Sequence, residues 1–329
     1  MTVNIKELNV VVQETKKKFQ NVCDEIGKAV IGQSKLVESL LIAILSDGHL
    51  LLEGLPGLAK TLAVTTLSKT IDSDFKRIQF TPDLLPADLL GTSIYNPKTG
   101  AFSIKKGPLF TNIVLADEIN RAPAKVQSAL LEAMAEKQIT ISGKTFCIED
   151  PFLVLATQNP VEQEGTYPLS EAQADRFMMK VKVPYPNRSE ERAILSRMLP
   201  SFNRPKIDKA IGIDDVLEAR RIVDEVYVDG RVMEYILDIV FATRCPKKRV
   251  PEIDGFLESG VSPRASIAMA KAARSLAFLN GRGFVTPHDV KNVGRSVLRH
   301  RLRLSYEAQA EDMSADAIID KIFDVLLAP

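Results

Sequence analysis

The stretch from His49 to Thr61 constrains the fold more strongly than any other part of this chain. It reads His-Leu-Leu-Leu-Glu-Gly-Leu-Pro-Gly-Leu-Ala-Lys-Thr, an apolar run, a turn containing glycine and proline, and then residues that favour a helix. When a loop connects a strand to the start of a helix, its backbone N–H groups and the helix N-terminus can point at the same place. Their partial positive charges attract an anion there. The stretch therefore predicts a phosphate-binding loop.

Lys60 and Thr61 are the side chains that such a loop uses. The lysine can reach the outer phosphates, and the threonine hydroxyl can ligate Mg²⁺. The residue before the lysine is usually glycine, whereas this chain has Ala59. We predict that the residues of the loop and the first helical turn bind the phosphates: Gly54, Leu55, Pro56, Gly57, Leu58, Ala59, Lys60, Thr61 and Leu62.

Five apolar runs recur in the first part of the chain, with helix-forming segments or long insertions between them. They cover residues 49–52, 75–80, 112–116, 152–157 and 179–183. Strands that alternate with helices indicate a mostly parallel sheet with right-handed crossovers. Ligands of such sheets bind at the carboxyl ends of the strands, which is where the loop after the first run lies.

Polar residues end the third and fourth runs. Asp117 and Glu118 follow the third run, where buried carboxylates are costly unless they have partners or a function. In phosphoryl transfer, one acid can hold the Mg²⁺ shell while its neighbour orients water; the alternative is an acidic strand end at the surface. Asn159 follows the fourth run and could hold water or a phosphate oxygen, or could simply form a turn before proline.

Composition excludes several classes of protein. The net charge is +1, from 43 basic and 42 acidic residues, which argues against a protein that coats nucleic acid or an anionic membrane. Three cysteines and three histidines show no metal-ligand spacing, which is typical of free thiols in a reducing compartment. We see no signal peptide and no apolar run of ~18–20 residues, so we expect a cytoplasmic protein without a membrane span.

Helical periodicity flanks the strand region on both sides. Amphipathic helices are predicted over residues 5–28 and 34–46, with Ser34 as the cap of the second. After residue 186 the pattern is helical almost throughout: from 189, and over 213–227, 231–244, 263–279, 287–299 and 314–327. Ser262 and Thr286 each precede a proline and are predicted to cap helices. We therefore predict an α/β domain over residues 1–186 and an all-helical domain over 187–329.

Two long insertions interrupt the α/β pattern. Residues 81–108 contain a hairpin signal around 96–100, and residues 137–149 contain a second one with its turn near Gly143. Loops of this length are often functional, although they can also be mere decoration.

Together these motifs resemble those of the MoxR family of AAA+ ATPases. The resemblance rests on Gly54–Thr61, Leu115–Pro123 and Ala156–Pro160, and extends to Gln127–Met134, Leu169–Phe177 and Gly260–Ala265. It covers residues 20 to 310, and alanine before the lysine is what this family has. It implies an AAA+ P-loop NTPase core with a parallel five-stranded sheet, followed by an all-helical lid domain, with ATP and Mg²⁺ as cofactors.

The resemblance also implies a role for each matched residue in the core. Lys60 would contact phosphates, while Thr61 and Asp117 would hold Mg²⁺. Glu118 would orient the hydrolytic water, and Asn159 resembles the first sensor. Residues 29–33, including Ile31 and Gly32, would line the adenine pocket.

Two arginines match family positions outside the loop. Arg176 resembles an arginine finger given to a neighbouring subunit, which suits the bidentate phosphate contacts of arginine; the alternative is a local ion pair with Glu171 or Asp175. Arg264 resembles the second sensor on the lid; the alternative is a helix-start arginine that faces solvent. An arginine finger supplied in trans requires an oligomer. A head-to-tail interface can close into a ring, and the resemblance implies a hexamer.

The family implies an ATP-driven, chaperone-like protein that remodels or activates a partner. Expected partners carry a von Willebrand factor A domain and often belong to the maturation of metalloenzymes. One alternative is a DNA-directed motor, favoured by Lys98, Lys105 and Lys106 near the first hairpin but opposed by the balanced charge and the lack of a clear stacking surface. The other is a nucleotide switch without useful turnover, which only Ala59 suggests. We expect no nucleic acid and no membrane among its partners.

Overall fold

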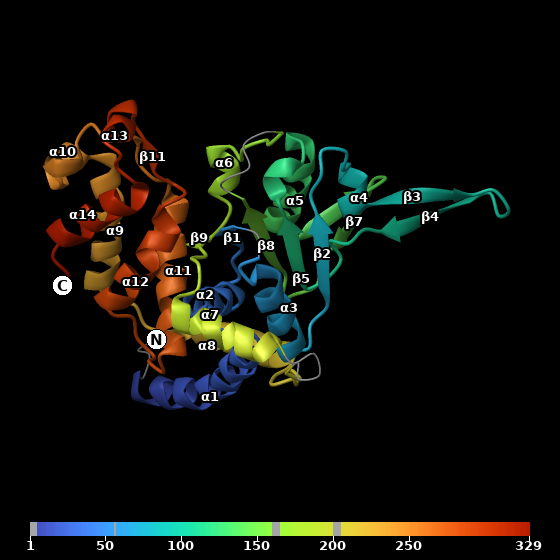
Figure 1. The fold of residues 1–329 in the computed structure, drawn as a ribbon, viewed down its shortest axis with the longest axis horizontal. Helices are drawn as coiled ribbons and strands as arrows, with labels where there is room; N and C mark the ends of the chain where they lie inside the picture. Colours follow the sequence, from blue (N-terminus) through green and yellow to red (C-terminus); the bar gives the residue numbers. More distant parts are fainter. Residues whose placement is uncertain (1–4, 56, 160–164, 200–204) are drawn as a thin grey trace.

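The computed structural model describes residues 5–55, 57–159, 165–199 and 205–329, and within them a parallel sheet of five strands forms the centre (Figure 1). The strand order is β2-β5-β8-β1-β9. The strands are β1 (Leu50–Glu53), β2 (Phe75–Gln79), β5 (Ile113–Asp117), β8 (Leu153–Gln158) and β9 (Met179–Lys182). The five predicted apolar runs are thus confirmed as five strands of one parallel sheet.

The order of these strands places the predicted motifs at one edge of the sheet. Strand β8 lies between β5 and β1, with Leu115 opposite Leu155 and Leu52 opposite Thr157. Because all three strands run the same way, the loop after β1, the acids at the end of β5 and the end of β8 share the carboxyl edge. Three strands, β1, β5 and β8, are buried almost throughout, since helices and hairpins cover both faces.

Helices cover the sheet. They include α1 (Ile5–Ala29), α2 (Ser34–Leu45), α3 (Lys60–Thr70) and α5 (Ala124–Glu136). The prediction that Ser34 caps α2 is wrong: the cap position is Gln33, and Ser34 is the first helical residue. The Gln33 side chain makes no capping bond and instead donates to the carbonyl of Pro184, 3.1 Å away.

Both predicted hairpins are present. The first is β3 (Gly91–Asn96) paired with β4 (Ala101–Lys106), preceded by the short helix α4 (Pro86–Leu90), and it projects away from the body (Figure 1). The second is β6 (Gln138–Ile141) paired with β7 (Lys144–Cys147). The first insertion is therefore an arm that extends from the α/β core, whereas the second packs Ile139 and Ile141 into the core.

The second half of the chain is mostly helical. Its longer helices are α7 (Arg188–Met198), α8 (Ile213–Glu225), α9 (Gly230–Arg244), α11 (Pro263–Leu279), α12 (Pro287–Leu298) and α14 (Ala315–Val325). The short elements of this half are α6 (Glu171–Ala174), α10 (Pro246–Arg249), α13 (Tyr306–Ala310) and the 3-10 turn η2 (Pro251–Ile253). Another 3-10 turn, η1 (Ile119–Arg121), follows β5 in the first half. Ser262 and Thr286 cap α11 and α12 through their side chains, as predicted.

One feature of this half differs from the prediction of an all-helical domain. Strands β10 (Leu257–Ser259) and β11 (Arg303–Leu304) form a short antiparallel ribbon. A two-residue strand is too short to give a periodic signal.

One apolar cluster runs from α1 through one face of the sheet to α14, and a second fills the other face under α5 and the hairpins. The domain boundary at residue 186 stays a prediction. In the part of the chain that the structure describes, none of the helices combines the length and the apolar character that a membrane span requires.

Candidate functional site

The loop after β1 has the conformation of an anion-binding turn. Gly57 and Ala59 have φ values of 84° and 56°, and α3 begins at Lys60 directly after the loop. The left-handed conformation at an alanine costs about 1–2 kcal/mol, so it requires support from the surrounding loop. At Gly54 a Cβ atom would lie 3.0 Å from the Val183 carbonyl oxygen, so only glycine fits well there. Pro56 lies outside the described residues.

Lys60 lies across this loop. Its ammonium donates to the Gly54 carbonyl oxygen over 2.6 Å. Burial lowers the pKa of Lys60, and the nearby charges of Asp117 and Glu118 partly offset that effect. An anion in the loop would give this half-buried ammonium a stronger partner than a carbonyl.

The remaining loop residues take different positions. Leu58 is buried and Leu55 packs against the same apolar core, so these two can offer a phosphate only their backbone. Thr61 is half-buried in the first turn of α3, whereas the Leu62 side chain is exposed.

The two acids at the end of β5 share a buried hydroxyl. Thr157, on β8, donates to Asp117 Oδ1 over 2.6 Å and accepts from the backbone N–H of Glu118 over 2.8 Å. Glu118 has a left-handed backbone with φ 57° and ψ 51°. The hydroxyl therefore fixes both acids relative to the strand that leads to Asn159.

Strand β2 holds the far side of the same acids. Arg77 donates to Asp117 Oδ2 over 2.6 Å, and Gln79 donates to Glu118 Oε2 over 2.8 Å. Arg121 also approaches Glu118, at 3.2 Å. Sequence reasoning missed Arg77, Gln79 and Thr157. A usable signal existed for the first two, since they alternate along β2 beside the acid-bearing strand.

Asn159 follows the last residue of β8 and is 9% exposed. Because β8 lies directly beside β5, Asn159 is at the same carboxyl edge as Asp117 and Glu118. The predicted loop, acids and asparagine therefore converge on one edge of the sheet.

A cavity of about 450 Å³ lies where residues 30–33 meet α1, α2 and α7. Gly32 and Gln33 line it, whereas Ile31 is not among its lining residues. The Gln33 side chain contacts the Pro184 carbonyl, next to the Val183 carbonyl that faces Gly54. This contact chain connects the predicted adenine-binding segment with the phosphate-binding loop.

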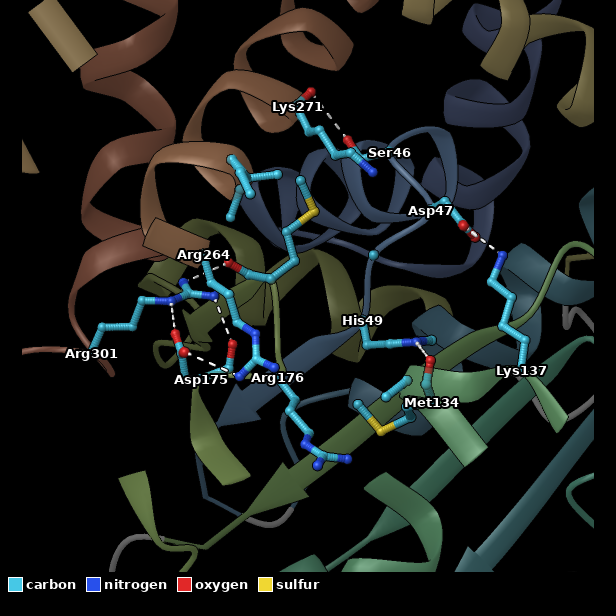
Figure 2. Close-up of a pocket in the computed structure, with 15 residues that line it drawn as sticks. Ser46, Asp47, His49, Met134, Lys137, Asp175, Arg176, Arg264, Lys271 and Arg301 are labelled. Carbon is cyan, nitrogen blue, oxygen red and sulfur yellow. Dashed lines mark hydrogen bonds and ion pairs between the residues drawn. The ribbon is translucent and has the colours of Figure 1, made fainter. Parts of the chain in front are cut away.

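Arg176 and Arg264 lie together at a different place. Both line a cavity of about 380 Å³ whose wall includes Gly48 and His49, which precede β1 (Figure 2). This is the amino edge of the sheet, opposite the phosphate-binding loop of the same chain. The two arginines therefore face away from the phosphate-binding loop of their own chain.

Arg176 contacts a backbone carbonyl, whereas Arg264 lies at an exposed helix start, as its alternative expects. Arg176 donates to the Leu131 carbonyl over 2.7 Å, while Glu171 pairs with Arg303 and Asp175 with arginines of the second half. Arg264, at the start of α11, is 59% exposed and lies 3.5 Å from Asp175.

Thr61 and Asp117 fit the chemistry of a nucleotide-bound Mg²⁺. In the described part of the chain, no three His, Cys, Asp or Glu side chains gather in a metal-binding group. Mg²⁺ bound to phosphates keeps several waters and needs only one or two protein ligands. A hydroxyl on α3 and a carboxylate at the end of β5 are oxygen ligands of this kind.

Comparisons with known proteins agree with this geometry. The family described as "ATPase family associated with various cellular activities (AAA)" matches residues 49–179, and the "AAA lid domain" matches residues 253–322. "Chaperone MoxR1" of Mycobacterium tuberculosis is 46% identical over 93% of this chain and 81% of that protein. "Protein MoxR" of Paracoccus denitrificans is 30% identical over 95% of this chain and 96% of that protein.

A solved structure gives the same result in three dimensions. The crystal structure of a putative ATPase from Cytophaga hutchinsonii superimposes with a TM-score of 0.91 at 48% identity, and the match covers 98% of each chain.

Proposed function

The chain belongs to the MoxR family of AAA+ ATPases, and we propose that it hydrolyses ATP to ADP and phosphate and uses the cycle to remodel or activate a partner protein. The observation that carries the proposal is the convergence of Lys60, the Asp117–Glu118 pair and Asn159 at one edge of the sheet. Among the residues that the structure describes, we see no second catalytic constellation that competes with it.

Each residue has a definite task in this proposal. Lys60 leaves the Gly54 carbonyl and contacts the outer phosphates. Because the site is half-buried, the attraction between the ammonium and the phosphates is stronger there than in water. Thr61 and Asp117 would hold Mg²⁺, which neutralises charge on the phosphate oxygens. Glu118 orients the attacking water. Asn159 binds a phosphate oxygen or that water, and Gly32 and Gln33 contact the base.

The arginines act between subunits in this proposal. Arg176 and Arg264 share one cavity at the sheet edge opposite their own loop, so the loop that they serve belongs to a neighbour. A head-to-tail contact of this kind repeats and can close into a ring, for which we propose six subunits. Arginine fingers raise rates by roughly 10³–10⁵ in other NTPases.

The experiment for hydrolysis is the ATPase rate of the Glu118→Gln protein. Glutamine keeps the size of the side chain but cannot accept a proton from water, so hydrolysis should be lost while nucleotide binding persists. Turnover equal to that of the unaltered protein would show that Glu118 does not position the water.

A protein partner is the finer part of the proposal. Its support is that a relative of 46% identity is named a chaperone. We propose a partner with a von Willebrand factor A domain, in the cytoplasm, with the maturation of a metalloenzyme as one setting. Affinity capture with the Glu118→Gln protein in ATP tests this, because a chain that cannot hydrolyse ATP should retain its partner.

A DNA-directed motor is the second candidate, because the structure shows an aromatic pair that sequence reasoning missed. Tyr95 and Phe102 lie opposite each other on the first hairpin, with ring centroids 5.1 Å apart and both side chains exposed. Lys98 is in the turn beside them, whereas Lys106 lies over the rings of Phe110 and Phe146. Absence of stimulation of the ATPase by DNA at low salt would exclude this candidate.

The switch without turnover has no such support. Ala59 adopts the left-handed conformation that a glycine would take in this loop, so its presence does not alter the path of the backbone.

A further inference from the structure

Lid side chains hold the backbone of the segment that carries Arg176. Arg301 Nη2 donates to the carbonyl oxygens of Asp175 and Phe177 over 3.1 and 2.7 Å, and its Nη1 donates to that of Met178 over 3.0 Å. His300 Nε2 lies 2.9 Å from the Phe177 carbonyl oxygen. Burial lowers the pKa of His300 well below its usual value, so the ring is neutral and Nε2 carries the proton that it donates.

The Asp175 side chain also contacts the lid, through its carboxylate (Figure 2). Its Oδ1 accepts from Arg301 Nε over 2.7 Å, and its Oδ2 accepts from the Ser262 hydroxyl over 2.9 Å. Arg264 Nη1 lies 3.5 Å from the same Oδ2. One carboxylate therefore connects α6 with the start of α11 and with the loop after α12.

Burial makes these contacts mutually dependent. The Arg301 side chain is only 3% exposed and that of Asp175 is 16% exposed. Burial alone would raise the pKa of Asp175, but the hydrogen bonds from Arg301 and Ser262 hold it below its usual value. A buried guanidinium without its carboxylate would be an uncompensated charge, so the segment and the lid are held in one arrangement.

We infer that Asp175 is a positioning residue that joins Arg176 on the core and Arg264 on the lid into one two-arginine unit for the nucleotide of the next subunit. Asp175 does not contact that nucleotide. The Arg176 side chain projects the other way, to the Leu131 carbonyl, while the Asp175 backbone and carboxylate stay with the lid. This inference rests on the proposed function, because it requires that the arginines act in trans.

The test uses one chain that supplies the arginines and a different chain that binds the nucleotide. A Lys60→Ala chain lacks a working loop but donates arginines, and an Arg176→Ala chain has a working loop but no finger. The two chains are co-expressed with different tags, mixed assemblies are isolated through both tags, and their ATPase rate is measured. Neither chain is active alone in our proposal, so activity in the mixture comes from interfaces where one chain serves the other.

Asp175→Asn is then placed in one chain at a time. In the Lys60→Ala donor it should lower the rate of the mixture by about 10²-fold, the size of effect expected when a catalytic group is displaced by about 1 Å. In the Arg176→Ala acceptor it should leave the rate unchanged, which also shows that the altered chain folds. Arg301→Lys in the donor should act like Asp175→Asn, since lysine cannot bridge the carboxylate and three carbonyls.

Asp316→Asn in the donor is the matched control. Asp316, on α14, pairs with Lys182 of β9 over 2.8 Å and with Arg299 over 2.9 Å, and so also ties the lid to the core, but it contacts neither Arg176 nor Arg264. The mixture should keep its rate with this variant.

Three results would overturn the inference. Asp175→Asn donors as active as Asp316→Asn donors would show that the carboxylate positions nothing, and equal losses in donor and acceptor would reveal a purely structural role. An inactive mixture of the Lys60→Ala and Arg176→Ala chains would refute the proposal that the arginines act on a neighbouring subunit. The inference about Asp175 would then fail as well. That last failure is recognisable because it appears before Asp175 is altered.

Discussion

At the scale of single residues, the Thr157 hydroxyl connects the two acids of the candidate site. It donates to Asp117 and accepts from the Glu118 N–H, and the side chain is 1% exposed. Thr157→Val keeps the shape but leaves a buried N–H without this partner, so the free energy of unfolding should fall by about 1–3 kcal/mol. The ATPase rate should fall as well, because both acids lose a fixed orientation. Denaturant unfolding and steady-state kinetics measure the two effects.

Thr157→Ser provides the control for this prediction. It restores the hydroxyl and should recover most of the ATPase rate. A valine variant as active as the unaltered protein would show that the hydroxyl does not orient the acids.

His49 gives the second prediction at this scale. The ring is buried, its Nδ1 accepts from the Val154 N–H over 3.0 Å, and burial lowers its pKa to about 4. The unfolded chain has a histidine pKa near 6.5, so between these values the unfolded state binds more protons, and stability is lost as the pH falls. This histidine should remove about 2 kcal/mol of unfolding free energy between pH 7 and pH 5.

Substitution of His49 isolates that contribution. His49→Asn should be less stable at pH 7 but should lose less stability on going to pH 5, as measured by denaturant unfolding at both pH values. His288→Gln, at an exposed position, should keep the pH dependence of the unaltered chain. An unchanged pH dependence in His49→Asn would show that this ring is not the titrating group.

Much of the site was predictable at the residue scale because it lies in contiguous motifs. Lys60, Asp117, Glu118 and Asn159 each directly follow an apolar run or a loop, and sheet topology alone brings them together. Arg301 was not predictable in this way. It lies after the end of α12, more than a hundred residues from Asp175, and no local pattern connects the two.

At the scale of elements, two helix caps provide a matched comparison. Ser262 caps α11 by accepting from the Arg264 N–H and also donates to Asp175. Ser314 caps α14 by accepting from the Ala317 N–H, a contact that stays within one helix of the lid. Each serine-to-alanine change should lower the free energy of unfolding by about 1 kcal/mol. Only Ser262→Ala should also lower the ATPase rate.

The comparison discriminates between stability and positioning. Thermal or denaturant unfolding measures how much stability each cap contributes. The steady-state ATPase rate measures whether the two arginines are still positioned for catalysis. Equal ATPase rates in the two variants would indicate that Ser262 acts only as a cap.

Elements were predictable to the extent that they are long and periodic. Helices α11 and α12 have the predicted starts because a hydroxyl and a proline mark them. The ribbon β10–β11 and the short helix α4 gave no such signal, since their few residues depend on tertiary contacts. The cap of α2 was misplaced because Gly32, with φ 74°, turns the chain one residue earlier than the serine suggested.

At the scale of the whole molecule, the residues predicted to bind the nucleotide and the two predicted family arginines lie at opposite edges of the sheet in one chain. The phosphate-binding loop is at the carboxyl edge of the sheet, and Arg176 and Arg264 are at the amino edge. The predicted strand at residues 179–183 already implied that Arg176, which precedes it, lies at the amino edge. The position of Arg264 could not be predicted, because it depends on how the lid packs on the core.

This separation gives the last prediction. If each nucleotide requires the arginines of a neighbour, the ATPase rate per chain should fall on dilution, as the assembly dissociates, toward the rate of a chain without a finger. The fall should approach about 10³-fold, and sedimentation at the same concentrations should show the loss of the assembly. Arg176→Ala should be slow at every concentration, because its assembly lacks the finger whether or not it dissociates. A rate per chain that is constant while the assembly dissociates would mean that each loop works with its own chain alone, which the positions of Arg176 and Arg264 at the far edge of the sheet argue against.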